Sequence, residues 1–210
     1  IPMPEVSDTD VPQFIEDQHD MLVEDARFVL DAMALLAAGD PDGVWTGRLD
    51  LSKVGAFGHS LGGSVAVGLC REDARCLAAD DIDGSLWGNA ASAEPFAKPL
   101  FLFLSESHAL ASDPSVSAVW DEASADAFAA LVGGAAHIDF ADYLLMLTAA
   151  PDVDPSLLGL GSLDAEVMHD INRDMNIAFF DAYVESGSAE EIDAVASEHE
   201  EVDLTPKAAR

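Results

Sequence analysis

The sequence predicts an α/β fold built on a mostly parallel sheet. Short apolar runs of strand length recur along the chain, and segments with helical periodicity or helical composition separate them. Strands that alternate with helices in this way form parallel βαβ units with right-handed crossovers. A chain of 210 residues is long enough to bury the core of one such domain.

The first expected element is a helix over residues 20–36. Its apolar residues fall on one helical face and are Leu22, Ala26, Val29, Met33 and Leu36. Glycine and proline within residues 37–43 end this helix. Residues 1–19 contain three prolines and little periodicity, so we expect an irregular lead-in there.

Four apolar runs follow and predict the strands of the sheet. They cover residues 54–58, 76–82, 99–105 and 128–132. Helices are expected between them at 61–71 and 115–127, and a last helix at 163–184. One face of that last helix carries Val167, Ile171, Met175, Ala178 and Ala182. The domain is therefore expected to span 20–187, and the acidic tail at 188–210 to hold at most one short helix before it frays.

The charge of the chain excludes several classes of partner. Forty acidic residues, 26 Asp and 14 Glu, oppose nine basic ones, which gives a net charge of −31. Such a polyanion is repelled by nucleic acid and by anionic membrane surfaces. Half of the residues are nevertheless hydrophobic, which indicates a folded protein and not a disordered acidic tail.

The acidic residues are spread over every segment, and lysine is scarce. Such a surface suits molar salt, in which the Debye length falls to about 3 Å. We therefore hypothesise a halophilic source, the alternative being an ordinary acidic, alanine-rich protein.

The cellular location stays open at this level. No apolar run is long enough to span a membrane, and no leader pattern precedes the first helix. A soluble protein is expected, either exported or cytoplasmic in a high-salt organism.

The spacing of Cys70 and Cys76 fits neither a metal-ligand pair nor a redox motif. A local disulfide and two buried thiols are both compatible with it.

The clearest chemical signal is Gly58-His59-Ser60-Leu61-Gly62. This G-x-S-x-G pattern follows an apolar strand and opens a helix of small residues, which is the context of a nucleophile elbow. Glycines two residues before and two after the serine are expected to remove Cβ atoms that would collide in the tight turn. Ser60 is then the candidate nucleophile, and the N–H of Leu61 is the candidate oxyanion donor.

A serine nucleophile needs a base and an acid. His137 follows the last apolar run and a Gly-Gly turn, at the carboxyl end of the sheet, and is the expected base; His108 is expected to be a solvated loop residue or a pocket-rim contact. Two acids remain open, because Asp83 and Glu106 each end a strand from which a carboxylate could reach the imidazole.

Five blocks in order carry a family resemblance: VEDARFVLD, GAFGHSLGG, DIDGSLWG, KPLFLFLSE and GGAAHIDFADY. This order resembles the platelet-activating-factor acetylhydrolase-like branch of the α/β-hydrolases, which is related to bacterial lipases and polyester hydrolases. The resemblance implies that Asp83 is the acid, with Glu106 kept as the alternative. It also implies a substrate pocket that includes His59 and Trp87, although simple core packing explains Trp87 equally well.

The resemblance implies a serine esterase that acts on short acyl esters, with no metal and no organic cofactor. It covers only the C-terminal two thirds of the family's domain. The family's early strands and its His-Gly oxyanion loop have no counterpart here, so we expect the elbow strand to have an open edge. A second copy, the lead-in or a separate N-terminal half could cover that edge. The alternative function is a non-catalytic, incomplete hydrolase module.

Overall fold

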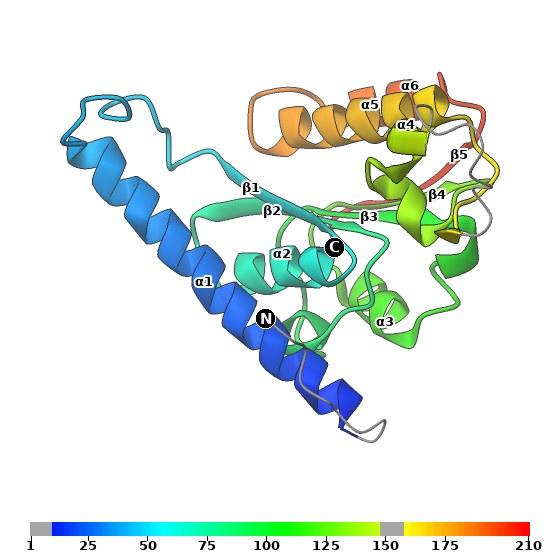
Figure 1. The fold of residues 1–210 in the computed structure, drawn as a ribbon, viewed down its shortest axis with the longest axis horizontal. Coiled ribbons are helices and arrows are strands. Elements are labelled where there is room, and N and C mark those ends of the chain that lie inside the picture. Colours follow the sequence, from blue (N-terminus) through cyan, green and yellow to red (C-terminus); the bar gives the residue numbers. More distant parts are fainter. Residues whose placement is uncertain (1–9, 148–157) are drawn as a thin grey trace.

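A computed structural model describes residues 10–147 and 158–210, and its centre is one five-stranded sheet (Figure 1). The strands lie in the order β1-β2-β3-β4-β5, and the first four are parallel. Their bounds are β1 Val54–His59, β2 Cys76–Ile82, β3 Leu100–Ser105, β4 Ala127–Val132 and β5 Val202–Lys207. The predicted α/β class with a mostly parallel sheet is confirmed.

Helices cover both faces of the sheet (Figure 1). On one face lie α2 (Leu61–Glu72) and α3 (Pro114–Glu122), and on the other lie α5 (Ala165–Tyr183) and α6 (Glu190–Ala196). The short elements are α4 Tyr143–Leu147 and the 3-10 turns η1 Gly88–Ala91, η2 Glu106–His108 and η3 His137–Phe140. No helix in the described ranges is both long and apolar enough to cross a membrane.

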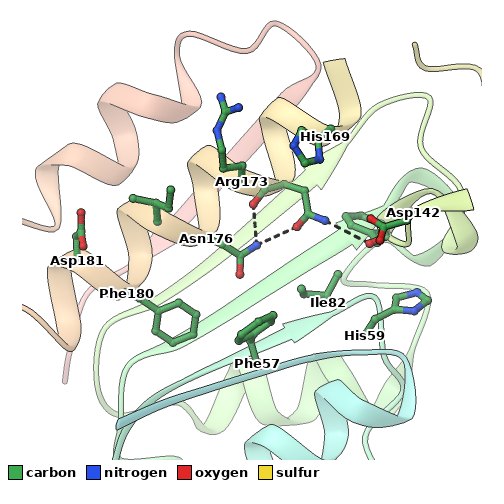
Figure 2. Close-up of a pocket in the computed structure, with 12 residues that line it drawn as sticks. Phe57, His59, Ile82, Asp142, His169, Arg173, Asn176, Phe180 and Asp181 are labelled. Atoms are coloured by element: carbon green, nitrogen blue, oxygen red, sulfur yellow. Dashed lines mark hydrogen bonds between the residues drawn. The ribbon is translucent and has the colours of Figure 1, made fainter. Parts of the chain in front are cut away.

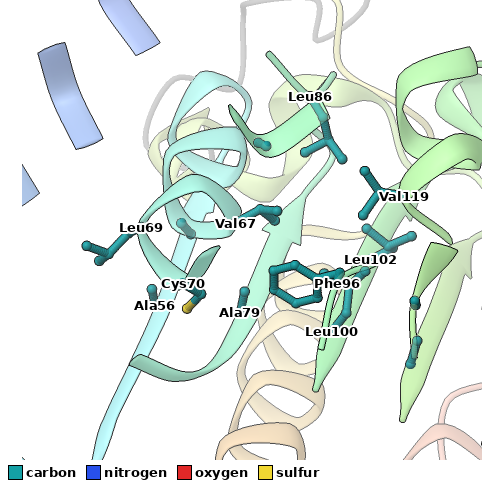
Figure 3. Packing of buried hydrophobic residues seen from close by; sticks show 14 of the residues in the cluster. Ala56, Val67, Leu69, Cys70, Ala79, Leu86, Phe96, Leu100, Leu102 and Val119 are labelled. Carbon is teal, nitrogen blue, oxygen red and sulfur yellow. The ribbon is translucent and has the colours of Figure 1, made fainter. Parts of the chain in front are cut away.

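The hydrophobic core has two layers, one on each face of the sheet, because helices cover both faces. In β3, Leu100, Leu102 and Leu104 join the cluster under α2 and α3, which Figure 3 shows. The alternating residues Phe101 and Phe103 join the cluster under α5 and α6. All five of these side chains are buried, as expected for a central parallel strand.

The first helix differs from its prediction at its start and in its buried face. α1 runs Val11–Gly39, so much of the expected lead-in is helical, and Pro12 fits its first turn because no N–H is needed there. Its buried residues are His19, Val23 and Leu30. Leu22, Val29 and Met33 are exposed instead. Apolar residues lie on two sides of this helix, and its packing on α2 and η1 decides which side is covered. Residues 1–9 lie outside the described ranges.

The predicted frayed tail is also wrong. After α6 the chain forms β5, which pairs antiparallel with β4 from Val202 to Lys207. Pro206 lies opposite Phe128 in this pair. An edge strand tolerates proline because one side of the strand needs no partner. Residues 202–207 therefore add a fifth strand beside β4.

The open edge expected for the elbow strand is present. Among the described residues β1 pairs with β2 alone, and Phe57 is 66% exposed. A groove of about 490 Å³ lies beside it, lined in part by Phe57, Ile82 and Phe180. Figure 2 shows these side chains between β1 and α5.

Cys70 at the end of α2 and Cys76 at the start of β2 form a disulfide. Both cysteines are buried. Of the two readings that the spacing allowed, the structure has the local disulfide.

Candidate active site

Ser60 occupies a sharp turn between the end of β1 and the start of α2. Its backbone has φ 59° and ψ −126°, a conformation that costs a non-glycine residue on the order of 1–3 kcal/mol. Its N–H donates to the carbonyl of Ile82 in β2 at 2.9 Å, and its own carbonyl accepts from Gly63. These bonds hold the turn in place, and the serine side chain lines a cavity of about 480 Å³.

The glycines around Ser60 do not all serve the expected purpose. A Cβ on Gly58 would lie 2.3 Å from the backbone of Gly62, so this glycine is required. A Cβ on Gly62 itself would have nothing within 4 Å. Gly63 is the second crowded position, because a Cβ there would meet Asp81 at 1.8 Å. The close approach on the helix side therefore belongs to Gly63 and not to Gly62.

Asp83 directly follows β2 and is 1% exposed. Its φ of 55° is in the left-handed region, which aspartate tolerates better than most residues. Its N–H donates to the carbonyl of Phe103, and its Oδ1 accepts from the N–H of Ser105 at 2.6 Å. Burial raises the pKa of Asp83, but hydrogen bonds from His108, Ser105 and His137 outweigh it and hold the pKa below its usual value.

His137 begins η3, just after β4 and the Gly133-Gly134 turn. Its Nδ1 lies 2.8 Å from Asp83 Oδ2, and its Nε2 lies 3.1 Å from Ser60 Oγ. With Nδ1 protonated toward the carboxylate, Nε2 is free to accept the serine proton. Three residues from the carboxyl ends of β1, β2 and β4 thus form one hydrogen-bonded line.

The other acid candidate lies elsewhere. Glu106 is exposed and its Oε2 accepts from the N–H of Gly134 at 2.9 Å. The carboxylate at His137 Nδ1 is that of Asp83. Glu106 thus braces the turn that leads to His137.

The expected pocket residues separate into two places. Leu61 and Trp87 line the same cavity as Ser60, together with Ile15 from α1. Leu61 is the first residue of α2, where backbone N–H groups have no intrahelical acceptor. His59 instead lines the groove along β1 (Figure 2). Its Nε2 donates to the carbonyl of His137 at 2.7 Å, and burial lowers its pKa.

His108, for which the sequence allowed a solvated loop residue or a pocket-rim contact, also lines this cavity. Its Nδ1 is 3.4 Å from Asp83 Oδ1, and its Nε2 is 3.0 Å from Asp113 Oδ2. The sequence signal for His108 was its position just after β3, which pairs with β2, the strand that Asp83 directly follows. No group of three or more His, Cys, Asp or Glu side chains that could hold a metal ion occurs within residues 10–147 and 158–210.

Comparison with solved structures gives a match to the ferulic acid esterase from Streptomyces cinnamoneus, with a TM-score of 0.77 and 25% sequence identity over 91% of this chain. The chain has the α/β-hydrolase fold. This match supports the superfamily that the sequence resembles, but not the particular acetylhydrolase-like branch. The match covers 56% of the length of the esterase chain. No protein-family model and no curated protein sequence matches the chain.

Proposed function

We propose that this protein is a serine hydrolase of short-chain carboxylic esters. The observation that carries the proposal is the continuous line from Ser60 Oγ through His137 to Asp83, with contacts of 3.1 and 2.8 Å. Serine is a weak nucleophile without a base, and the base needs an oriented partner. The esterase match supports the same reaction class.

The reaction follows from these positions. Ser60 Oγ attacks the ester carbonyl carbon while His137 Nε2 takes its proton, and the N–H of Leu61 donates to the oxyanion. The C–O bond to the alcohol breaks, and the alcohol leaves with the proton from His137. Water then attacks the acyl-serine and gives one proton to His137. The bond from the acyl carbon to Ser60 Oγ breaks, His137 returns the proton to Oγ, and the carboxylic acid leaves. Asp83 holds the imidazole in the required orientation throughout.

Turnover of p-nitrophenyl butyrate tests this mechanism. We expect Ser60→Ala to lose at least about 10³-fold in kcat, as expected when a triad nucleophile is removed, and to stop labelling by a fluorophosphonate. Ser52→Ala is the matched control, because Ser52 is exposed and bonds only to Asp50 among the contacts described. Undiminished turnover in Ser60→Ala would refute the proposal.

The same assay separates the alternatives. If the wild-type chain is neither labelled nor active, it is a non-catalytic hydrolase-fold module. If the wild-type chain is active, its rates on a feruloyl ester and on p-nitrophenyl esters of increasing acyl length define the preferred substrate. Loss of rate with longer chains supports an esterase, and a gain of rate supports a lipase.

A further inference from the structure

His108 is placed between two carboxylates at the wall of the candidate active site. Its Nδ1 faces Asp83 at 3.4 Å and its Nε2 faces Asp113 at 3.0 Å. A neutral imidazole has one N–H and can donate to only one of them, whereas an imidazolium donates to both. The geometry therefore favours the charged ring, which is only 19% exposed.

Asp113 is itself fixed, which makes this contact more than a surface ion pair. Asp113 caps α3 by accepting from the N–H groups of Ser115 and Val116. Its other oxygen accepts from Ser85 Oγ at 2.6 Å as well as from His108. The α3 cap thus anchors the far side of the His108 ring.

Both carboxylate oxygens of Asp83 are contacted by other residues. His137 bonds to Oδ2, while His108 and the Ser105 N–H contact Oδ1. Asp81 on β2 also interacts electrostatically with His108, although burial raises the pKa of Asp81 well above its usual value. The titratable groups around this ring are therefore Asp81, Asp83 and Asp113. The hydrogen bond to Asp83 raises the pKa of His108 to about 9, with Asp113 adding to it against burial.

We propose that His108 is a positioning residue that, as an imidazolium, holds the Asp83 carboxylate in place from the side opposite His137. The inference rests on the proposed function, because it acts through the acid of that triad. Both ring nitrogens are engaged by protein carboxylates, so His108 does not bind the substrate directly.

Two substitutions separate positioning from mere packing. In His108→Asn the amide nitrogen lies near the Nδ1 position and keeps a donor for Asp83. In His108→Gln it lies near the Nε2 position and keeps a donor for Asp113. We expect His108→Gln to lower kcat by about 10-fold or more, the size expected when a hydrogen bond to a charged group is lost, with KM little changed. His108→Asn should lose less.

The pH profile gives a readout that packing alone would not move. Asp83 must be ionised, and its pKa is held down in part by His108. Loss of the cation raises that pKa and favours a proton on the coupled His137–Asp83 pair. The acidic limb of kcat/KM reports this protonation, so it should move to higher pH in both variants. His199→Gln is the matched control, since His199 also faces a carboxylate, Asp174, at 3.3 Å but lies outside this cavity.

A spectroscopic test is independent of catalysis. In a ¹⁵N-labelled protein at pH 7.5, both His108 ring nitrogens should appear protonated, and Asp113→Asn should lower the pH at which the second proton is lost. A neutral His108 ring, or full activity with an unmoved acidic limb in His108→Gln, would overturn the proposal. Absence of any wild-type esterase activity would instead refute the proposed function, and the ring spectrum would still decide whether the ion pair exists.

Discussion

The hydrogen-bonded line of Ser60, His137 and Asp83 joins residues from the carboxyl ends of three strands, β1, β4 and β2. The G-x-S-x-G turn marks Ser60 because its context, strand before and helix after, is local. His137 and Asp83 could be placed only as far as strand ends, since the choice between Asp83 and Glu106 depended on a family resemblance. The part played by His108 depends on distances between three segments, which no spacing in the sequence encodes.

Asp80 carries a prediction at this same scale. It lies within β2, paired in register with Phe57 and Phe101, and is wholly buried. Neither of its carboxylate oxygens has a hydrogen-bond partner in the described structure. Burial raises its pKa well above the usual value, so the folded state holds this proton to higher pH than the unfolded chain does.

Asp80→Asn should therefore stabilise the protein in a pH-dependent way. A raised folded-state pKa gives stability that is fully present below the unfolded pKa, about 3.9, and is lost as pH rises. Asparagine mimics the protonated acid, so its melting temperature should match the wild type near pH 4 and exceed it at pH 8. Asp203→Asn, at an exposed position in β5, is the control. A difference that shrinks between pH 4 and pH 8 would contradict this account.

At the scale of elements, the strands agreed closely with the sequence and the helices less so. Apolar runs bounded by polar or glycine residues define β1 to β4 to within one residue. The α3 helix ends at Glu122, before the expected 127, because Ala123 bridges to Phe96. β5 was not predicted because its sequence, VDLTPK, contains a proline and lacks the continuous apolar run of a central strand. Its pairing with β4 orders it.

The elbow yields a matched pair of glycine substitutions. Gly58→Ala places a Cβ against the Gly62 backbone, and overpacking of this kind costs about 1–3 kcal/mol. We expect a lower melting temperature and a large loss of esterase activity. Gly62→Ala meets nothing within 4 Å and gains up to about 1 kcal/mol of helix propensity. Chemical denaturation of both variants checks this, and equal destabilisation of the two would contradict it.

The net charge of −31 affects the stability of the whole molecule. Self-repulsion opposes the compact state, and salt screens it because the Debye length shortens from about 10 Å at 0.1 M to 3 Å at 1 M. We expect the melting temperature to rise from low salt to molar KCl, with sucrose at matched osmolality as the uncharged control. A melting temperature that stays flat or falls in KCl would argue against the halophilic interpretation.

The sequence by itself determined the α/β class, the central strands and the serine turn, because each depends on local periodicity or local backbone geometry. Tertiary structure alone decided which face of α1 is buried, that residues 202–207 form the fifth strand β5, and that Gly63, not Gly62, is crowded on the helix side of the elbow. It also brought His108 between Asp83 and Asp113. These features depend on which segments meet across the fold, and contacts between distant segments leave no fixed spacing along the chain.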